Sequence, residues 1–436
     1  MPSVNFYFQV HQPFRLGTCS YLNRNKRGVH NYFDADKNGQ IMRKVAEKCY
    51  LPTNQLILKL IKRYNGAFRA AYSITGVAIE QMERYAPQAL DSFKALADTG
   101  CVEFIGETYY HSLCSLYDEA EFRDQVQLHR ELMQEVFGQS PRVFRNTELI
   151  YQDHIGLMAQ QLGFKAIIAE GCDDVLGWRN PNFVYTVPNS EMRLLLKNYR
   201  LSDDIAFRFS NRAWSDWPLT ADKFAKWVHD ISGNGEILNL FMDYETFGEH
   251  QWESTGIFQF LEHLPEAVLR HPDWQFSTPS QVIEAYAPKA DIHFHRLTSW
   301  ADVNRDISAW RGNRMQHSAL EKIYAVSAQM RKSGDEYALD IWRKLQTSDH
   351  FYYMCTKWFA DGDVHAYFSP YESPYDAFIN YMNAFKDFSE YFPEKRIARI
   401  ERSVQVLSTP TAPSKRDGRL PPESVREEVR LPTAPH

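Results

Sequence analysis

Apolar runs and amphipathic stretches alternate through the first two thirds of the chain. The runs are rich in β-branched and aromatic residues, which predicts buried strands. The predicted strands are Val4–Val10, Ala67–Ile74, Cys101–Ile105, Arg142–Arg145, Lys165–Ala169, Met192–Lys197, Glu236–Met242 and Trp274–Ser277. Apolar positions at helical spacing predict helices at Val77–Asp98, Ser115–Phe137, His154–Leu162, Thr220–Ser232 and Ser254–Arg270. This alternation favours an α/β fold with a parallel sheet, most simply a barrel, whose site lies at the carboxyl ends of the strands.

From about Gln316 the pattern changes to helices only. Predicted helices in this part are Gln316–Ser333, Asp335–Phe359, Pro374–Phe392 and Glu394–Leu407. The final residues, Leu407–His436, are rich in proline and lack aromatic residues, so they bury too little apolar area to offset the cost of ordering. We therefore expect a barrel over residues 1–300, a helical subdomain over 301–406 and a disordered tail over 407–436.

Charge and hydropathy narrow the class of protein. The 436 residues carry 49 basic and 55 acidic side chains, a formal net charge of −6, which argues against a nucleic-acid partner. No uncharged stretch is long and apolar enough to span a membrane. The N-terminal Met1–Asn5 lacks the basic side chain of a secretory signal, so we expect a cytoplasmic protein without a membrane partner. The 6 cysteines form no CxxC pair and are expected to be reduced.

Aromatic residues are unusually frequent. The chain has 10 Trp, 24 Tyr and 28 Phe, many of them beside acidic or amide residues. Sugar-binding clefts have this composition, because the apolar faces of sugars stack on rings while hydroxyl groups bond to carboxylates and amides. A tyrosine-rich interior is the alternative interpretation.

Polar residues at the ends of the predicted strands are the candidates for chemistry. His11 follows the first strand, and Glu103 lies between apolar residues within the third. Glu148 and Asp243 each occur where an apolar strand ends. A buried carboxylate has to be paired or functional, because an isolated buried charge is very costly.

Two carboxylates that converge on one cleft are what glycoside hydrolysis requires. One attacks the anomeric carbon and the other protonates the leaving oxygen. A separation of roughly 5–5.5 Å gives retention and one of roughly 6.5–9.5 Å gives inversion. Structural salt bridges to Arg142 or Arg145 are the alternative explanation, and Glu245 is a rival to Asp243 for the acid.

A family resemblance adds to this reading of the residues. Segments of the chain resemble, in order, the sequence signatures of glycoside hydrolase family 57, and the fourth is most similar to the family's α-amylase group. The segments are His11-Gln12-Pro13, Gly100–Phe104, Arg145–Tyr151, Met242–His250 and Leu345–Tyr353. The resemblance implies an incomplete (β/α)7 barrel, a C-terminal helical region that closes the cleft, no metal or other cofactor, and a retaining mechanism on α-1,4-glucans or malto-oligosaccharides.

The resemblance also implies roles for individual residues. Glu148 matches the family's nucleophile and Asp243 its general acid/base. The other expected substrate-binding residues are His11, Gln12, Glu103, Arg145, His250, Asp349, His350 and Tyr353. Physical reasoning fits the two catalytic roles: the apolar residues before Asp243 raise its pKa, and Arg145 beside Glu148 keeps that carboxylate ionised.

Alternative functions remain open at this stage. A 4-α-glucanotransferase or branching enzyme uses the same covalent intermediate, although some such members have Trp where this chain has His250. A non-catalytic glucan-binding protein would also explain the aromatic residues. A metal-dependent deacetylase is a further alternative. The pairs His293–His295 and His11–His111 could suggest a metal, but no HExxH motif accompanies them.

Overall fold

The fold is a barrel whose strands belong to two short, mostly parallel sheets that together form one ring. The computed structural model describes residues 1–20, 32–357 and 369–390. In the first sheet, β1 (Ser3–Val10) pairs in parallel with β2 (Ala70–Ile74) and β8 (Ile237–Asp243), and β3 (Val102–Phe104) pairs with β2. The short β9 (Gln275–Phe276) pairs with the start of β1. The second sheet has the order β4-β5-β7-β6, from β4 (Val143–Arg145), β5 (Ala166–Glu170), β7 (Arg193–Lys197) and the antiparallel β6 (Tyr185–Thr186).

Backbone hydrogen bonds join the two sheets into a barrel. Gly106, just after β3, forms a parallel bridge to Phe144, with Gly106 N–H donating to the Val143 carbonyl at 2.8 Å. Glycine is needed there, because a Cβ would lie 2.7 Å from the ring of Phe164. On the other side, the N–H of Asn198, at the end of β7, donates to the Asn239 carbonyl in β8 at 2.9 Å. The parallel circuit β1-β2-β3-β4-β5-β7-β8 confirms the predicted (β/α)7 barrel.

Alternation along the strands gives the barrel an apolar interior with a polar upper layer. Inward-facing residues of the strands form one apolar cluster, which includes Tyr7, Val143, Ile168, Leu195 and Phe241. Two positions further along, each strand turns a polar side chain inward at its carboxyl end. These side chains are Gln9, Ser73, Arg145, Glu170, Lys197 and Asp243. The strand pattern therefore places polar groups together at the end where chemistry was expected.

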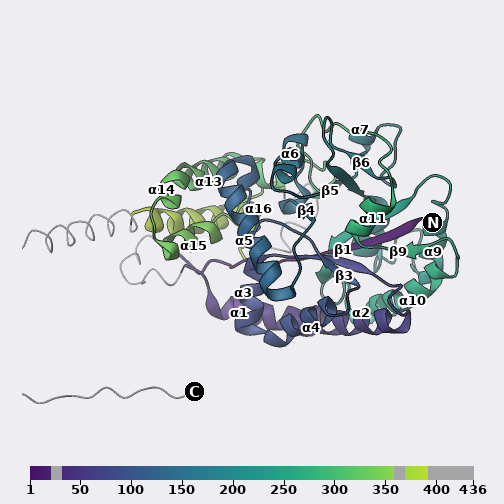
Figure 1. Cartoon of the computed structure of the whole chain (residues 1–436). Coiled ribbons are helices and arrows are strands. Elements are labelled where there is room, and N and C mark those ends of the chain that lie inside the picture. Colours follow the sequence, from purple (N-terminus) through teal and green to yellow (C-terminus); the bar gives the residue numbers. More distant parts are fainter. Residues whose placement is uncertain (21–31, 358–368, 391–436) are drawn as a thin grey trace, which may run out of the picture. The chain divides into compact units, whose positions relative to one another are not determined.

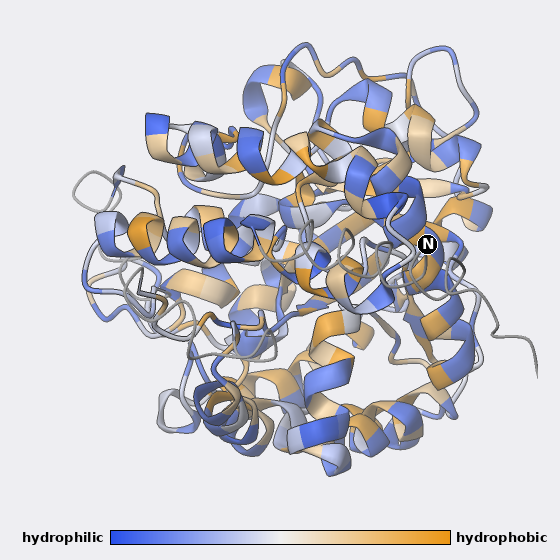
Figure 2. Cartoon of the chain, turned by 90° about the vertical axis from the view of Figure 1, so that its left-hand side faces the viewer, coloured by the Kyte–Doolittle hydropathy of each residue, from blue (hydrophilic) through white to orange (hydrophobic). Residues whose placement is uncertain are grey.

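Helices cover the outside of the barrel and pack apolar residues on its core; Figure 2 shows hydrophobic and hydrophilic residues mixed along them. The main ones are α1 (Ala35–Val45), α2 (Leu51–Arg63), α3 (Gly76–Tyr85), α4 (Pro87–Ala97), α5 (Glu119–Phe137), α6 (Asp153–Gln161), α9 (Ala221–His229) and α10 (Ile257–Leu269). The predicted helix Val77–Asp98 is two helices, because Pro87 starts a new one. The helix predicted to begin at Ser115 begins at Glu119, and Asp118 caps it through the N–H groups of Ala120 and Glu121.

The part after the barrel is helical, as predicted. It contains α12 (Ser308–Arg311), α13 (Arg314–Ala325), α14 (Ser327–Arg331), α15 (Glu336–Lys344), α16 (Ser348–Tyr352) and a helix over 374–390. The predicted helix Asp335–Phe359 is wrong as one element, since the chain turns between α15 and α16. Arg343 on α15 forms a buried ion pair of 2.8 Å with Glu121 on α5, so α15 is anchored to a barrel helix (Figure 1).

Some predicted elements lie outside the residues that the structure describes. Met1–Phe388 form one compact unit and Ser389–His436 a second, of which only residues 389 and 390 are described. The predicted helix Glu394–Leu407 and the tail over 407–436 lie outside the described residues, and the domain limits stay predictions. Of the helices in the described part, none has the length and apolar character that crossing a bilayer requires.

Candidate active site

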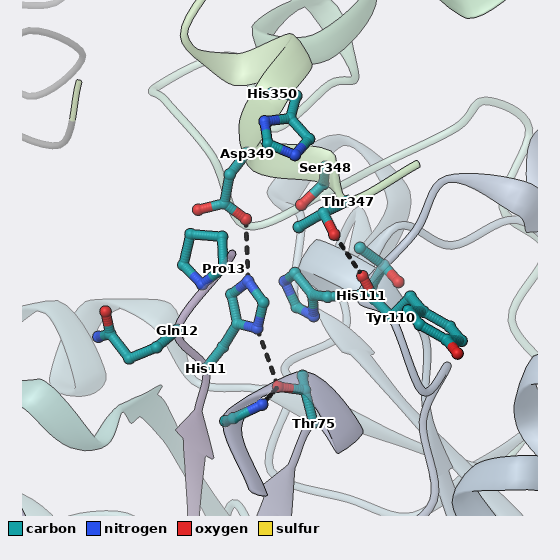
Figure 3. Close-up of polar contacts among 12 residues, drawn as sticks. His11, Gln12, Pro13, Thr75, Tyr110, His111, Thr347, Ser348, Asp349 and His350 are labelled. Atoms are coloured by element: carbon teal, nitrogen blue, oxygen red, sulfur yellow. Dashed lines mark hydrogen bonds and ion pairs between the residues drawn. The ribbon is translucent and has the colours of Figure 1, made fainter. Parts of the chain in front are cut away.

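His11 links the first barrel strand to the helical region. It directly follows β1, and Figure 3 shows its ring between Thr75 and Asp349. His11 Nδ1 lies 3.0 Å from Thr75 Oγ1, and His11 Nε2 lies 2.9 Å from Asp349 Oδ2. Burial lowers the pKa of His11, which favours the neutral ring. Nε2 of that neutral ring donates to the carboxylate, and Nδ1 accepts from the hydroxyl. The contact joins the predicted substrate-binding residues His11 and Asp349.

His111, in the loop after β3, bridges two carboxylates. Its Nδ1 lies 3.1 Å from Glu107 Oε2 and its Nε2 lies 3.2 Å from Glu148 Oε1. Burial alone would lower the pKa of His111, but the hydrogen bonds with Glu107 and Glu148 raise it to about 9. The ring is therefore cationic at neutral pH. It stacks on the ring of His11, with 3.9 Å between the ring centroids. Burial would raise the pKa of Glu107, but contact with His111 lowers it to about 2.

Glu148, the predicted nucleophile, is held by hydrogen bonds to both carboxylate oxygens. Oε1 accepts from His111 and, at 3.0 Å, from the hydroxyl of Ser348 at the start of α16. Oε2 accepts from the indole N–H of Trp300 at 2.8 Å. Burial would raise the pKa of Glu148, but the hydrogen bond and positive charge of His111 lower it below its ordinary value. Glu148 is therefore ionised at neutral pH.

The backbone at Glu148 has an unusual conformation. Its φ is 58° and that of Leu149 is 50°, the left-handed region that non-glycine residues seldom adopt. Neighbouring segments hold this turn: Trp300 N–H donates to the Glu148 carbonyl at 3.3 Å, and Tyr151 N–H donates to the Thr298 carbonyl at 3.0 Å. Such strain is typical of functional sites that the surrounding structure holds in place.

Asp243, the predicted acid, lies in a different environment. It is the last residue of β8 and faces the barrel interior above Phe241. Burial and the negative charge of Glu148 raise its pKa to about 6. The two carboxylates therefore differ in charge near pH 6: Glu148 is ionised, whereas about half of Asp243 is protonated, and this difference fits the division of roles between a nucleophile and an acid.

Arg145 supports the acidic groups from inside the barrel. It is fully buried, with Nη1 3.7 Å from Glu107 Oε2, and its guanidinium lies 4.9 Å from the centroid of the Trp300 ring. Lys197 Nζ lies 5.5 Å from the same ring and 3.1 Å from Asp203. The position of Arg145 is consistent with its predicted place in the site, although its contacts are with the protein's own groups.

Glu103 lies deeper in the barrel than the other predicted site residues. Its carboxylate accepts from the backbone N–H of Ser280 at 2.9 Å and from the Ser280 hydroxyl at 2.6 Å. Ser280 lies in the first turn of α11 (Pro279–Ala285), where Val282 packs into the apolar barrel interior. Glu103 pairs with Ala71 in register, and Ala71 with Tyr7, which places it several residues below His11. Its carboxylate is thus bound by the protein's own groups, and substrate binding by Glu103 stays a prediction. The acid of this segment that reaches the site is Glu107.

Glu245 is also separated from Asp243. The strand ends at Asp243, and Glu245 belongs to a short 3-10 turn, Tyr244–Thr246, so the two side chains do not share a strand face. Glu245 accepts from the Tyr50 hydroxyl at 2.5 Å and from Gln12 Nε2 at 3.2 Å. Burial and the charge of Asp243 raise the pKa of Glu245 to about 8. Gln12 therefore binds a neutral carboxyl group beside the site.

The other predicted substrate-binding residues are arranged around α16 and the loop after β8. Figure 3 shows Asp349 and His350 pointing in different directions. His350 Nε2 lies 3.2 Å from the Lys344 carbonyl and its ring lies 5.7 Å from Tyr381. Tyr353 is buried, with its ring 5.9 Å from Tyr371. Burial lowers the pKa of His250 to about 4, so that ring is neutral. Substrate contact by these three residues stays a prediction.

Sequence reasoning missed Trp300, Ser348 and Lys197. Lys197 ends the predicted strand Met192–Lys197 two positions after the inward-facing Leu195, so strand alternation could have identified it. Trp300 lies in an irregular segment with no local signal. In the part of the chain that the structure describes, no group of three or more His, Cys, Asp or Glu side chains could hold a metal ion.

The barrel and the paired carboxylates define the class of the protein, an enzyme that cleaves glycosidic bonds. Residues 5–295 match the model of the glycosyl hydrolase family 57, and the chain belongs to this family. It is 45% identical over 410 residues to the "Putative alpha-amylase" of Methanocaldococcus jannaschii, a match that covers 91% of this chain and 86% of the relative.

Solved structures support the fold. A branching enzyme from Thermococcus kodakaraensis superposes with a TM-score of 0.66 at 13% identity, over 93% of each chain. The 4-alpha-glucanotransferase from Thermococcus litoralis superposes with a TM-score of 0.61 at 14% identity, over 80% of this chain. This chain spans 56% of the length of that transferase. At these identities the likeness concerns the fold alone.

Proposed function

We propose that this protein is a retaining hydrolase of α-1,4-glucans, of the α-amylase type. The observation that carries the proposal is the pair Glu148 and Asp243: one carboxylate is held ionised by His111 and Trp300, and burial keeps the other protonated up to about pH 6. The choice of α-glucan is supported by the name of the similar "Putative alpha-amylase" of M. jannaschii, which matches most of this chain.

In the first step, Glu148 attacks the anomeric carbon while Asp243 gives its proton to the glycosidic oxygen. The glycosidic bond breaks, the leaving sugar departs with that proton, and an ester joins Glu148 to the remaining sugar. Attack needs the ionised Glu148, and departure needs the protonated Asp243. The pKa of Asp243, about 6, suits both states of this residue within one catalytic cycle.

In the second step, Asp243 acts as a base. It takes a proton from water, the hydroxide oxygen attacks the anomeric carbon, and Glu148 leaves as the carboxylate. The hydrogen bonds from Trp300, Ser348 and His111 stabilise this leaving carboxylate. Two inversions at one carbon give net retention.

The test is incubation with maltoheptaose, with products resolved by length, reducing ends followed, and the Glu148→Gln protein alongside. Shorter sugars with rising reducing ends, absent from the variant, are the expected result. Products both longer and shorter than the substrate, with a constant number of reducing ends, would show that the enzyme transfers glucan chains and would contradict hydrolysis. No change in the parent protein would contradict both, and leave a glucan-binding protein as the alternative.

Retention itself is tested by recording the anomer of the first product by NMR. The α-anomer is expected, and initial release of the β-anomer would contradict a covalent intermediate on Glu148. The cytoplasmic location predicted from the N-terminal residues belongs to this proposal, and fractionation of cells that produce the protein would check it.

A further inference from the structure

A groove with aromatic residues lies outside the barrel, in the long connection between β7 and β8. It is an open depression of about 440 Å³, lined by Arg200, Leu201, Asp204, Arg208, Trp214, Asp216 and Trp227. The first of these residues belong to α8 (Tyr199–Asp203) and the π-helical turn Asp204–Arg208, and Trp227 belongs to α9. None of the lining residues is among the predicted catalytic or substrate-binding residues. The volume falls in the range of about 300–1,000 Å³ that is usual for small-ligand sites.

Two partly exposed indoles form the apolar part of the groove. Trp214 and Trp227 lie with 6.1 Å between ring centroids at an angle of 67°, and both rest on the outer core of the barrel. Large aromatic side chains at the surface of a groove offer apolar area at a low entropic cost of ordering. The two rings therefore present surfaces, inclined to each other, on which a ligand with apolar faces can pack.

The polar groups of the groove are already fixed. Arg208 Nε donates to Asp204 at 2.5 Å and Arg208 Nη2 to the Arg200 carbonyl at 2.8 Å, and its guanidinium lies 5.8 Å from the Trp214 ring centroid. Lys223 Nζ donates to the backbone carbonyl of Asp216 at 2.6 Å, which holds the turn that carries this acid. A ligand would meet groups that need little further ordering.

The charges of the groove select for a neutral ligand. Arg208 is paired with Asp204 within the groove, and Arg200 is paired with Asp173 next to it, so both guanidinium groups already have a carboxylate partner, and Asp216 adds a further carboxylate. An anion or a cation would meet a like charge at close range, whereas hydroxyl groups donate to carboxylates and accept from guanidinium groups. A neutral polyhydroxylated molecule with apolar faces matches both the indoles and the charges.

We infer that this groove is a distal carbohydrate-binding site that holds an α-glucan chain of a polymeric substrate. The inference rests on the proposed function, which supplies α-glucan as the sugar. Asp203, next to Asp204, bonds to Lys197 at the end of β7, so the helical segment that carries the groove is anchored at the edge of the catalytic cleft. A polymer held at the groove would raise the local concentration of chain ends near that cleft.

The test compares binding to glycogen and to maltotriose, with all proteins carrying Glu148→Gln so that the sugar stays intact. Migration through glycogen-containing native gels gives the polymer affinity, and calorimetry gives the maltotriose affinity. Trp214→Ala and Trp227→Ala should each weaken glycogen binding at least fivefold and leave maltotriose binding within twofold. Trp178→Ala is the matched control, because Trp178 is 90% exposed and lies outside the groove.

Trp214→Leu and Asp216→Ala guard against a folding defect, because the leucine keeps apolar packing and Asp216 lies in a surface turn. Both should show the same selective loss with an unchanged melting temperature. Unchanged glycogen binding in the groove variants, or an equal loss in Trp178→Ala, would overturn the inference. The proposed function is tested separately, by turnover of maltoheptaose with the protein that carries Glu148. Absence of that turnover would contradict the proposed function, whereas the binding results above test only the groove.

Discussion

The indole N–H of Trp300 donates a 2.8 Å hydrogen bond to Oε2 of Glu148, across 152 positions of sequence. The same two residues are joined by a backbone hydrogen bond of 3.3 Å from Trp300 N–H to the Glu148 carbonyl. Trp300 therefore fixes both the side chain and the strained backbone of the proposed nucleophile. It acts as a positioning residue for Glu148, and its ring lies 4.9 Å from the Arg145 guanidinium.

Trp300→Phe should move the acidic limb of the pH–rate profile upward. The substitution keeps the ring but removes one donor to the ionised carboxylate, so the pKa of Glu148 rises. A hydrogen bond to a charged group contributes about 1.5–3 kcal/mol, which corresponds to roughly 1–2 pH units. The measurement is kcat/KM against pH. Trp274→Phe is the control, because it also removes a partly buried indole hydrogen bond, here of 3.1 Å to Ser232. An acidic limb that stays in place in Trp300→Phe would refute the role.

Substitution should distinguish Asp243 from its neighbour Glu245. Asp243→Asn removes the transferable proton and should lower kcat on maltoheptaose roughly 10²–10⁴-fold. Glu245→Gln should stay within about fivefold, because an amide oxygen can still accept from Tyr50, and the carboxyl with a pKa of about 8 is already neutral near pH 6. A loss in Glu245→Gln as large as that in Asp243→Asn would reverse the assignment.

An activated substrate gives a second check on Asp243. Fluoride leaves without a proton, so Asp243→Asn should retain its first step on α-maltosyl fluoride, while Glu148→Gln should not. Stopped-flow release of fluoride measures this step. Failure of the fluoride substrate to rescue Asp243→Asn would show that the carboxyl does more than protonate the leaving group.

The charge of His111 should make stability depend on pH in the alkaline range. Its folded-state pKa, about 9, lies above the ordinary value of 6.5, so its contribution is fully present below about pH 6.5 and is lost as pH rises to 9. The free energy of unfolding should fall over this window in the parent protein. His111→Asn should remove most of that fall and cost about 3–5 kcal/mol near pH 6, since two acids lose their shared cation. Urea titrations at pH 6 and pH 9 measure both effects. If the free energy of unfolding fell equally between these pH values in the two proteins, the assignment to His111 would be contradicted.

The ionised carboxylate of Asp243 should lower the free energy of unfolding at neutral pH. Its folded-state pKa of about 6 exceeds the ordinary 3.8, so folding is favoured while the carboxyl is protonated, and this advantage is lost as pH rises through 6. Asp243→Asn should therefore raise the melting temperature at pH 8, with a gain in the free energy of unfolding of about 3 kcal/mol, and should change the melting temperature little at pH 3.5. Calorimetry at the two pH values tests this. A variant that is less stable than the parent at pH 8 would contradict the claim that the ionised Asp243 lowers the stability of the folded protein.

The strands were predictable because their residues are buried on both faces. Met192–Lys197 was expected and Arg193–Lys197 is observed, and Glu236–Met242 became Ile237–Asp243. Continuous apolar runs of this length mark parallel strands covered by helices. The first strand, expected at Val4–Val10, is longer by one residue. Local composition was enough for these elements.

Helix breaks were harder to predict. Residues 335–359 show helical spacing of apolar residues, yet the chain turns at Thr347, where the hydroxyl donates to the Tyr110 carbonyl at 2.9 Å and the backbone bridges to Ser112. This contact with a distant loop outweighs the local helical preference. It also begins α16 at Ser348, which lets Ser348 reach Glu148 and Asp349 reach His11.

The sequence by itself determined the succession of strands and helices and the acids at the strand ends, because burial and turn chemistry are local properties of the chain. It placed Glu148 and Asp243 correctly at one end of the barrel. Only the tertiary structure decided their charges, since these depend on His111, Trp300 and Ser348 from distant segments. It likewise showed the depth of Glu103 in the barrel, because that depth depends on how far each strand is shifted along its neighbours in the closed ring.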